Sequence, residues 1–309
     1  MPRAKTTCAR TPGHGGDCMT PTNMANRREY NRLHGHRESA ESRKKSNRKY
    51  RIASYGLTQE DFDLLVFQTT SGNWSGYADA TSIQPNYAQM FWTVPQLGSA
   101  EALGDTDYSV IWPGIGSGVG GELIQDGTEQ YVSCGVVLGD CANSGQTNFF
   151  WLEAVPADPF EEEVTNLTPN TGDSVAAAIY WSSSTGAEFT LCDFTQNECV
   201  TGSQSVAGPD NWAEWIIERP TLCITGQPVL PSLAPYGNLT VTGAGYDETP
   251  LGDLEYSIFP GDAIFTNQID MYDADNNLLA AASSLGDGNS SFISAWLNYG
   301  AATVENGTC

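Results

Sequence analysis

Two segments of the chain place carboxyl groups on an aromatic, strand-like background. In Ala213–Glu218 (AEWIIE), strand alternation puts Glu214 and Glu218 on the same face. In the segment NFFWLEAVP, Glu153 shares a face with Trp151. An ionised carboxylate is costly to bury beside aromatic rings, so such groups tend to have perturbed pKa values, which are frequent in active sites. Taken alone, each pattern is more typical of an exposed residue at a strand end.

The other reactive residues are distributed so that most catalytic classes are excluded. The chain has 309 residues, with 14 Lys and Arg, 37 Asp and Glu, three His and a formal net charge of −23. All the His and all but one of the cations precede residue 52, so the rest of the chain carries a single cation, Arg219, and a net charge of −32. Without His or Lys, this part cannot form a Ser-His-Asp triad, a Schiff base or a Ser–Lys pair. Its charge also opposes binding to nucleic acid.

The excess of carboxylates favours an acidic working environment. At pH 7 so many like charges oppose the compact state, whereas near pH 3, below model carboxyl pKa values of about 4, most would be neutral. Carboxylates whose pKa is lowered by native partners have the opposite effect. A halophile-like or merely soluble acidic surface is the alternative interpretation.

From Ser71 onward the sequence predicts an all-β domain. Short alternating runs bounded by Gly, Asn, Asp and Pro recur roughly every ten residues, which is typical of a β-sandwich or barrel. The runs expected to be strands include YSVIWPGIG, ELIQDGTEQYV, NFFWLEAVP, SVAAAIYWSSS, AEWIIERP and SFISAWLNYG. No run of about 18 apolar residues exists, which argues against a membrane span.

Residues 1–70 differ in character and are predicted to be a separate basic arm. The first 51 residues carry a net charge of +9, and Thr58 with Asp61 suggests a helix N-cap. The segment YGLTQEDFDLLVFQ resembles the opening of phage-type recombination (HNH) endonucleases, but the Cys pairs and His of such nucleases do not follow. We expect a partly helical or disordered leader or fusion remnant without a signal-peptide pattern, and contact with nucleic acid remains an alternative.

Six Cys lie in the predicted domain. CGVVLGDC and CDFTQNEC each hold two Cys seven positions apart around turn-like residues, a spacing suited to a bridge across the base of a hairpin. Six Cys allow 15 pairings, and the last pair follows by elimination. Disulfides imply an oxidising compartment, so we expect a secreted protein. The expected pairs are Cys134–Cys141, Cys192–Cys199 and Cys223–Cys309.

Several motifs, in order along about 230 residues, resemble the glutamic peptidases (eqolisins), particularly bacterial-type members. They are NWSGY, FWTVP, SVIWPGIG followed by ELIQDGTEQ, FWLEAVP, AEWIIERP, and DMYDADNNLLAAASSLGDGNSSFISAW. Each is weak alone, and their common order is specific. The resemblance implies a two-sheet antiparallel β-sandwich of the concanavalin type over residues 71–309, acting as an acid endopeptidase on polypeptides. It implies no metal and no cofactor, and we expect a monomer.

The resemblance also implies the site. The catalytic Gln and Glu of the family match Gln125 and Glu218. A carboxylate can take a proton from water and return it to the leaving amine, while a neutral amide orients the water and donates to the oxyanion. Hydrogen bonds should therefore hold the pKa of Glu218 down. The residues expected to shape the site are Trp74, Trp112, Trp151 and Glu153.

Two positions depart from the family pattern. Gly116 stands where many members have Asp after the Gly-Ile pair, and Phe149 stands where fungal members have Asp. We expect both changes to affect the pH profile and the substrate preference rather than the dyad.

Three alternatives remain open at this point. Paired carboxylates with many Trp and Tyr also suit a carbohydrate-binding or glycoside-hydrolysing sandwich. A non-enzymatic secreted module, or an arm that covers the acidic domain as an inhibitory leader, fits the opposite charges of the arm and the domain.

Two other motifs are interpreted as structural. The glycine-rich GSGVGG is interpreted as a loop rather than a nucleotide site, and Asp273, Asp275 and Asn277 are interpreted as a turn rather than a calcium loop.

Overall fold

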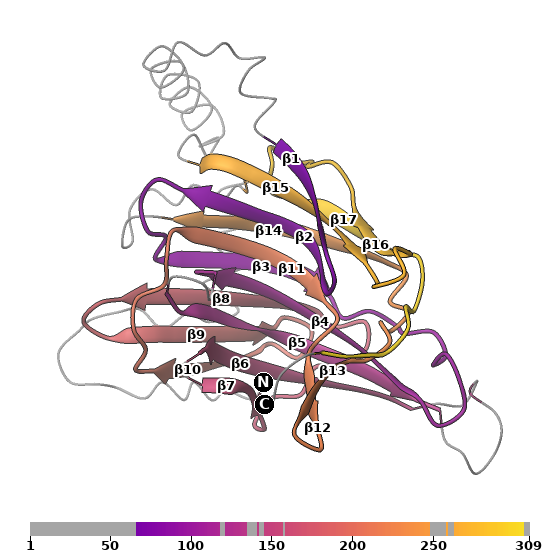
Figure 1. Ribbon diagram of the computed structural model, residues 1–309. Coiled ribbons are helices and arrows are strands. Elements are labelled where there is room, and N and C mark those ends of the chain that lie inside the picture. Colours follow the sequence, from indigo (N-terminus) through magenta and orange to yellow (C-terminus); the bar gives the residue numbers. More distant parts are fainter. Residues whose placement is uncertain are drawn as a thin grey trace.

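The computed structural model describes residues 66–117, 121–134, 141, 145–156, 158–247, 258 and 263–305 (Figure 1). The named elements of these ranges are all β-strands, as the alternating sequence predicts. Within the described ranges no helix has the length and apolar character needed to cross a membrane. The helix expected near Thr58 lies outside the described residues.

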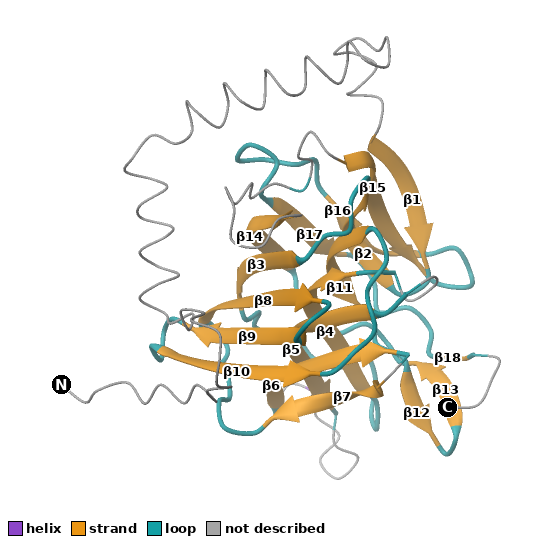
Figure 2. Ribbon diagram, turned by 90° about the vertical axis from the view of Figure 1, so that its left-hand side faces the viewer, coloured by secondary structure: helices purple, strands orange, loops and turns teal. Residues whose placement is uncertain are grey.

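The strands form a sandwich in which β14 belongs to both layers. The order along the path is β10-β9-β8-β3-β14-β17-β16-β15-β2-β11-β4-β5-β6-β7, and a three-stranded sheet has the order β12-β13-β18. Neighbouring strands pair antiparallel, apart from β1, which pairs parallel with β15. In Figure 2, β8 and β9 lie in front of β4 and β5, which shows the two layers face to face. The predicted all-β, two-sheet antiparallel sandwich is confirmed.

The larger layer contains β1 (Val66–Ser71), β2 (Trp74–Thr81), β4 (Thr106–Ile115), β5 (Leu123–Ser133), β6 (Gln146–Val155), β7 (Asp158–Val164), β11 (Trp212–Glu218), β14 (Asn238–Asp247), β15 (Ala263–Tyr272), β16 (Leu278–Ala282) and β17 (Phe292–Trp296). The second layer contains β3 (Tyr87–Thr93), β8 (Ser174–Ser182), β9 (Gly186–Asp193) and β10 (Glu198–Gln204), together with β14. The small sheet contains β12 (Leu222–Ile224), β13 (Gln227–Leu230) and β18 (Thr303–Val304).

The core lies between the two layers and contains two buried Trp residues. The Trp215 indole N–H donates to the Gln89 carbonyl oxygen at 3.0 Å, and the Trp92 indole N–H donates to Thr128 Oγ1 at 3.1 Å. Each bond joins one layer to the other, so the indole polar atoms are satisfied inside an otherwise apolar interior. This packing fixes β11 and β5, the strands that carry Glu218 and Gln125.

The first strand begins earlier than the predicted boundary at residue 71. β1 covers Val66–Ser71 and pairs with β15 from Val66 opposite Thr266 to Ser71 opposite Met271. Its β-branched and aromatic residues suit a strand at this position. The sandwich therefore includes residues 66–70, which the sequence had assigned to the arm.

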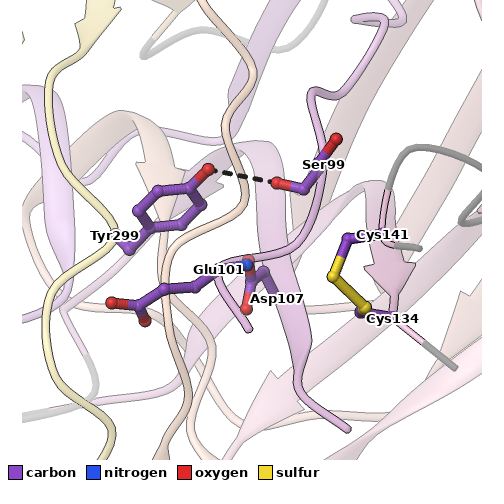
Figure 3. Close-up of a disulfide and its surroundings, with 6 residues drawn as sticks. All are labelled: Ser99, Glu101, Asp107, Cys134, Cys141 and Tyr299. Atoms are coloured by element: carbon purple, nitrogen blue, oxygen red, sulfur yellow. Dashed lines mark hydrogen bonds between the residues drawn. A yellow bond between two sulfur atoms is a disulfide. The ribbon is translucent and has the colours of Figure 1, made fainter. Parts of the chain in front are cut away.

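Two predicted disulfides are confirmed. Cys134 pairs with Cys141, and Cys192 pairs with Cys199. Cys223 is also disulfide-bonded, while its expected partner, Cys309, lies outside the described residues. Figure 3 shows the Cys134–Cys141 bridge near two contacts that fix the loop before β4: the Tyr299 hydroxyl donates to the Ser99 carbonyl oxygen, and the Glu101 N–H donates to Asp107.

Candidate active site

The candidate site lies on the face of the larger layer that is turned away from the core. Along β11, Ala213, Trp215 and Ile217 belong to the core cluster between the layers. The alternate residues, Glu214, Ile216 and Glu218, therefore point to the opposite face. There Ile216 packs in a second apolar cluster with Trp112, Trp151 and, at its margin, Trp74 and Phe149. The predicted alternation of AEWIIE is confirmed, and the face is lined with aromatic rings.

Glu218 is bound at both of its carboxylate oxygens. The Trp112 indole N–H donates to Oε2 at 2.8 Å, and the Asn73 side-chain amide donates to Oε1 at 3.1 Å. The ring of Trp74 packs edge-on against Trp112, with 5.3 Å between the ring centroids. Trp74 and Asn73 are brought to Glu218 by the pairing of β2 with β11, in which Trp74 lies opposite Glu218. These contacts fix the rotamer of the carboxylate.

The pKa of Glu218 is raised to about 7, chiefly because the carboxyl group is buried. The Trp112, Trp74 and Asn73 donors lower the pKa, and the charge of Glu153 raises it further. The Trp74 N–H lies near Glu218 but does not meet the geometry of a full hydrogen bond, so Trp112 and Asn73 are the donors that hold the carboxylate. The expectation that hydrogen bonds hold this pKa down is therefore wrong, because the desolvation of the charged form outweighs the donors.

Gln125 lies on the same face, in the neighbouring pair of strands. Its side-chain N–H donates to Glu153 Oε2 at 2.5 Å, across the pairing of Gln125 with Glu153 in β5 and β6. Because a carboxylate only accepts hydrogen bonds, this contact determines which end of the amide is the NH₂ group. The amide oxygen, Oε1, is buried and has no hydrogen-bond partner. Gln125 thus keeps one free acceptor and a second N–H.

The Trp112 indole extends from Glu218 toward the strand position opposite Gln125. Gly114, two residues after Trp112, lies opposite Gln125 in the register of β4 and β5. A Cβ atom at Gly114 would lie 2.7 Å from Trp112 Cζ3, so the missing side chain leaves room for the six-membered ring. The same indole contacts Glu218 through its N–H at the other end. The ring therefore reaches from Glu218 to the strand position opposite Gln125. Glu153 lies close enough to raise the pKa of Glu218.

Two further carboxyl groups belong to this face and were missed by sequence reasoning. Burial raises the pKa of Glu129 to about 7, and burial and the neighbouring charge of Glu129 raise the pKa of Glu161 well above its ordinary value. Glu161 also experiences the charges of Glu153 and Glu218. Glu129 could have been found, since it lies four residues after Gln125 in one strand and so shares its face. Strand pairing brings Glu161 and Asn73 to the site, and this pairing cannot be read from the sequence.

The two departures from the family pattern have distinct structural consequences. Gly116 has a φ of +91°, and a Cβ atom there would lie 1.9 Å from the Glu122 carbonyl oxygen. An Asp would therefore be strained at this position in this backbone. Phe149 lies opposite Glu129 in the register of β5 and β6 and packs at the margin of the aromatic cluster. It places an apolar ring next to a buried carboxyl group.

The predicted turn at Asp273 is confirmed. The Asn277 side chain donates to Asp273 Oδ2 at 2.9 Å, and the backbone N–H groups of Asp275 and Asn277 donate to Oδ1. Across the described ranges of the chain, no group of three or more His, Cys, Asp and Glu side chains is arranged to hold a metal ion. Part of the GSGVGG segment, residues 118–120, lies outside those ranges.

Comparison with known proteins agrees with this architecture. The sandwich presents carboxyl, amide and indole groups on one face, a set that suits general acid–base hydrolysis. Residues 72–293 match the peptidase A4 family, so the chain belongs to that family, the eqolisins or glutamic peptidases, and is a peptide hydrolase. The predicted membership is confirmed, and it favours peptide over glycoside hydrolysis. No curated protein matches the chain.

The chain is also similar to solved structures. Scytalido-glutamic peptidase with a transition state analog inhibitor is 18% identical, with a TM-score of 0.56, and a second structure of that peptidase with a peptide-based analog is 21% identical, with a TM-score of 0.53. SCP-B, an eqolisin in complex with the tripeptide Ala-Ile-His, is 20% identical, with a TM-score of 0.51. Each match covers 74% of this chain and 100% of the other. At these identities the likeness concerns the fold.

Proposed function

We propose that the protein is a secreted, acid-acting endopeptidase in which Glu218 and Gln125 activate a water molecule against a peptide bond. The observation that supports it is the double anchoring of Glu218 by Asn73 and Trp112, with the Trp112 ring extending to the strand position opposite Gln125. A peptide bound between Glu218 and Gln125 would have its scissile carbonyl between a carboxyl group and an amide, with the buried Trp112 ring behind Glu218. Polypeptides are the proposed substrates.

Glu218 acts first as a general base and then as a general acid. It takes a proton from the attacking water, and it returns that proton to the nitrogen of the leaving amine. With a pKa of about 7, about 1% of the groups are ionised at pH 5, and the protonated form is a competent acid for the second step. The rate should therefore rise with pH toward the pKa of about 7, so the ionisation of Glu218 favours activity in weak acid over activity near pH 3. Burial raises the pKa of Glu129 to about 7 and the pKa of Glu161 well above its ordinary value, so their protonated forms can donate to the substrate in acid. Ionisation of Glu129 above about pH 7 would then limit the rate.

Gln125 positions the water and stabilises the oxyanion. Glu153 holds one N–H of the amide, which leaves the second N–H to orient the water and then to donate to the tetrahedral oxyanion. An amide is neutral at every pH, so this donor does not depend on acidity. Glu153 and Trp112 are positioning residues. Trp74 is partly exposed and can contact the peptide, whereas Trp151 is buried and supports the aromatic cluster.

The test compares the full-length protein with single-site variants on a denatured protein substrate from about pH 2 to 7. Glu218→Gln and Gln125→Ala should each lower kcat/KM by about 10²- to 10⁴-fold, because each removes a proton-transfer or oxyanion group. The matched control is Glu188→Gln, which changes an exposed carboxylate on β9. Cleavage by Glu218→Gln at the rate of the parent would refute the proposal.

Export is the remaining part of the proposal. Disulfides are rare in reducing compartments, and two intrachain bridges are present in the sandwich. We expect the enzyme to work outside the cell as a monomer. Retention of both bridges in protein recovered from the medium, and their absence from a cytosolic pool, would support this part.

A further inference from the structure

A cavity of about 310 Å³ lies next to the end of β11. Its lining comes from the end of β1, the residue after β11, the turn after β15 and the end of the described chain, among them Ser71, Arg219, Asp273 and Glu305. This volume is at the lower end of the range of small-molecule sites and corresponds to about ten water molecules. A single amino acid or a dipeptide has this size.

Arg219 gives the cavity a cation with unused hydrogen-bonding capacity. It is the one Lys or Arg after residue 51 of the sequence, and only 1% of its surface is exposed. Its Nη1 group donates to the Ala301 carbonyl oxygen at 3.3 Å, whereas Nε has no partner. A buried guanidinium donor without an acceptor is costly, and Arg219 lines the cavity, so an anionic group there would be stabilised by its charge.

The cavity also carries negative charge. Asp273 and Glu305 line it, and both act electrostatically on Arg219. The Asp273 oxygens already accept bonds from Asn277 and Asp275, while Glu305 has an exposed side chain. A multiply charged anion such as phosphate would meet both carboxylates. A molecule with one carboxylate and one ammonium group complements both the Arg219 cation and the acidic side chains of the cavity.

The cavity is connected to the catalytic carboxylate through a short path. Arg219 follows Glu218 directly, and its backbone N–H donates to the Asn73 carbonyl oxygen at 2.8 Å. Ser71 lines the cavity, and its Oγ accepts from the backbone N–H of Asn73 and of Trp74. The side chain of Asn73 then holds Glu218. A ligand that orders Ser71 and Arg219 would therefore act on the residues that anchor Glu218.

We propose that this cavity binds an α-amino carboxylate, with its carboxylate on Arg219 and its ammonium group toward Glu305, and that binding modulates the active site through Asn73. The proposal rests on the proposed function, since each peptide cleavage releases one new carboxylate and one new amine. The ligand is thus either a free amino acid or a short peptide product, and its occupancy reports the accumulation of product.

Calorimetric titration of the full-length Glu218→Gln variant at about pH 6 and low salt tests binding without hydrolysis. The probes are glycine and glycylglycine, with acetate and ethylamine as single-charge controls. Glycine or glycylglycine should bind saturably at one site and at least about tenfold more tightly than acetate or ethylamine. Only a zwitterion can contact both Arg219 and Glu305. Preference for glycine indicates a free amino acid, and preference for glycylglycine a peptide product. Absence of saturation, or equal binding of acetate, would overturn the proposal.

Variants of the cavity distinguish a binding site from packing. Arg219→Lys keeps the charge but loses the planar fork and should weaken binding at least about tenfold. Glu305→Gln changes an exposed group that can be replaced without unfolding, and it should weaken binding several-fold, whereas Glu198→Gln, an exposed change on β10, should have no effect. Affinity unchanged in Arg219→Lys and Glu305→Gln would overturn the proposal.

In the active protein, the bound probe should shift the pH profile of kcat/KM, and it should do so less in Glu305→Gln. Binding with these dependences in a protein that cleaves no peptide would support the cavity and refute the proposed function.

Discussion

Replacement of Trp112 by Phe removes one donor from the catalytic carboxylate and keeps an aromatic ring. The indole N–H lies 2.8 Å from Glu218 Oε2 and is the first of the hydrogen bonds that lower the pKa of this group. A hydrogen bond to a charged group contributes about 1.5–3 kcal/mol. At about 1.4 kcal/mol per pKa unit, its loss should raise the pKa of Glu218 from about 7 by about one to two units.

This shift has a defined effect on the rate. At pH 5 the ionised fraction of Glu218 falls about 10- to 100-fold when its pKa rises by one to two units. We therefore expect kcat/KM of Trp112→Phe at pH 5 to fall by that factor and the acidic limb of the pH profile to move upward by the same one to two units. The assay is cleavage of a fluorogenic peptide by the full-length protein, measured at substrate concentrations well below KM from pH 3 to 8.

The control is a Trp with a hydrogen bond away from the site. The Trp296 indole N–H donates to the Leu233 carbonyl oxygen at 3.2 Å, so Trp296→Phe loses a comparable bond and should leave the acidic limb in place. A loss of packing alone in Trp112→Phe would lower the rate equally at every pH. An acidic limb that stays in place or moves downward would show that Trp112 does not stabilise the ionised Glu218.

Three other changes test neighbouring parts of the argument. Gly114→Ala places a Cβ atom 2.7 Å from the Trp112 ring and should lower kcat/KM at least about tenfold with the fold intact by circular dichroism, whereas Gly145→Ala, which meets no atom within 4 Å, should not. Burial raises the pKa of Asp126 well above its ordinary value, so Asp126→Asn should raise the urea midpoint at pH 7 and change it little at pH 3; a lower midpoint at pH 7 would contradict this. Replacement of both Cys of the 192–199 bridge by Ser should lower the free energy of unfolding by about 2.5 kcal/mol, from the entropy of an eight-residue loop, and an unchanged urea midpoint would refute the estimate.

The sequence was sufficient for the parts of the fold that depend on local pattern. The alternation in AEWIIE correctly separated Trp215, which packs in the core, from Glu218, and the seven-residue spacing of the Cys correctly predicted two bridges. Strand β1 was missed because its VFQTTS segment follows a helix-like, polar stretch, and its strand conformation depends on the edge that β15 offers. Local propensity cannot reveal such a partner.

The site required more than local pattern. Gln125 and Glu218 are 93 positions apart, and only the family resemblance connected them. The direction of the Glu218 pKa shift was predicted wrongly because the sequence indicates which donors a carboxylate can find but not how far it is removed from water. Glu161 lies in β7 and is brought to the site by the pairing of β7 with β6. This pairing could not be inferred from the sequence of β7, because its acidic run resembles an exposed strand.

Buried acids connect the composition of the domain to the pH at which it works. Burial raises the pKa of Asp79, Asp126 and Glu214 well above their ordinary values. A group whose pKa is higher in the folded state stabilises the fold fully below its unfolded pKa, about 4, and this contribution is lost as the pH rises through the folded value. Asp273 acts in the opposite sense, since its hydrogen bonds with Asn277 lower its pKa, but it lies in an exposed turn. The buried acids therefore favour a fold that is most stable in acid. Glu129 and Glu161 are protonated over the same range, so the face that carries Glu218 is least charged in the pH range where the fold is most stable.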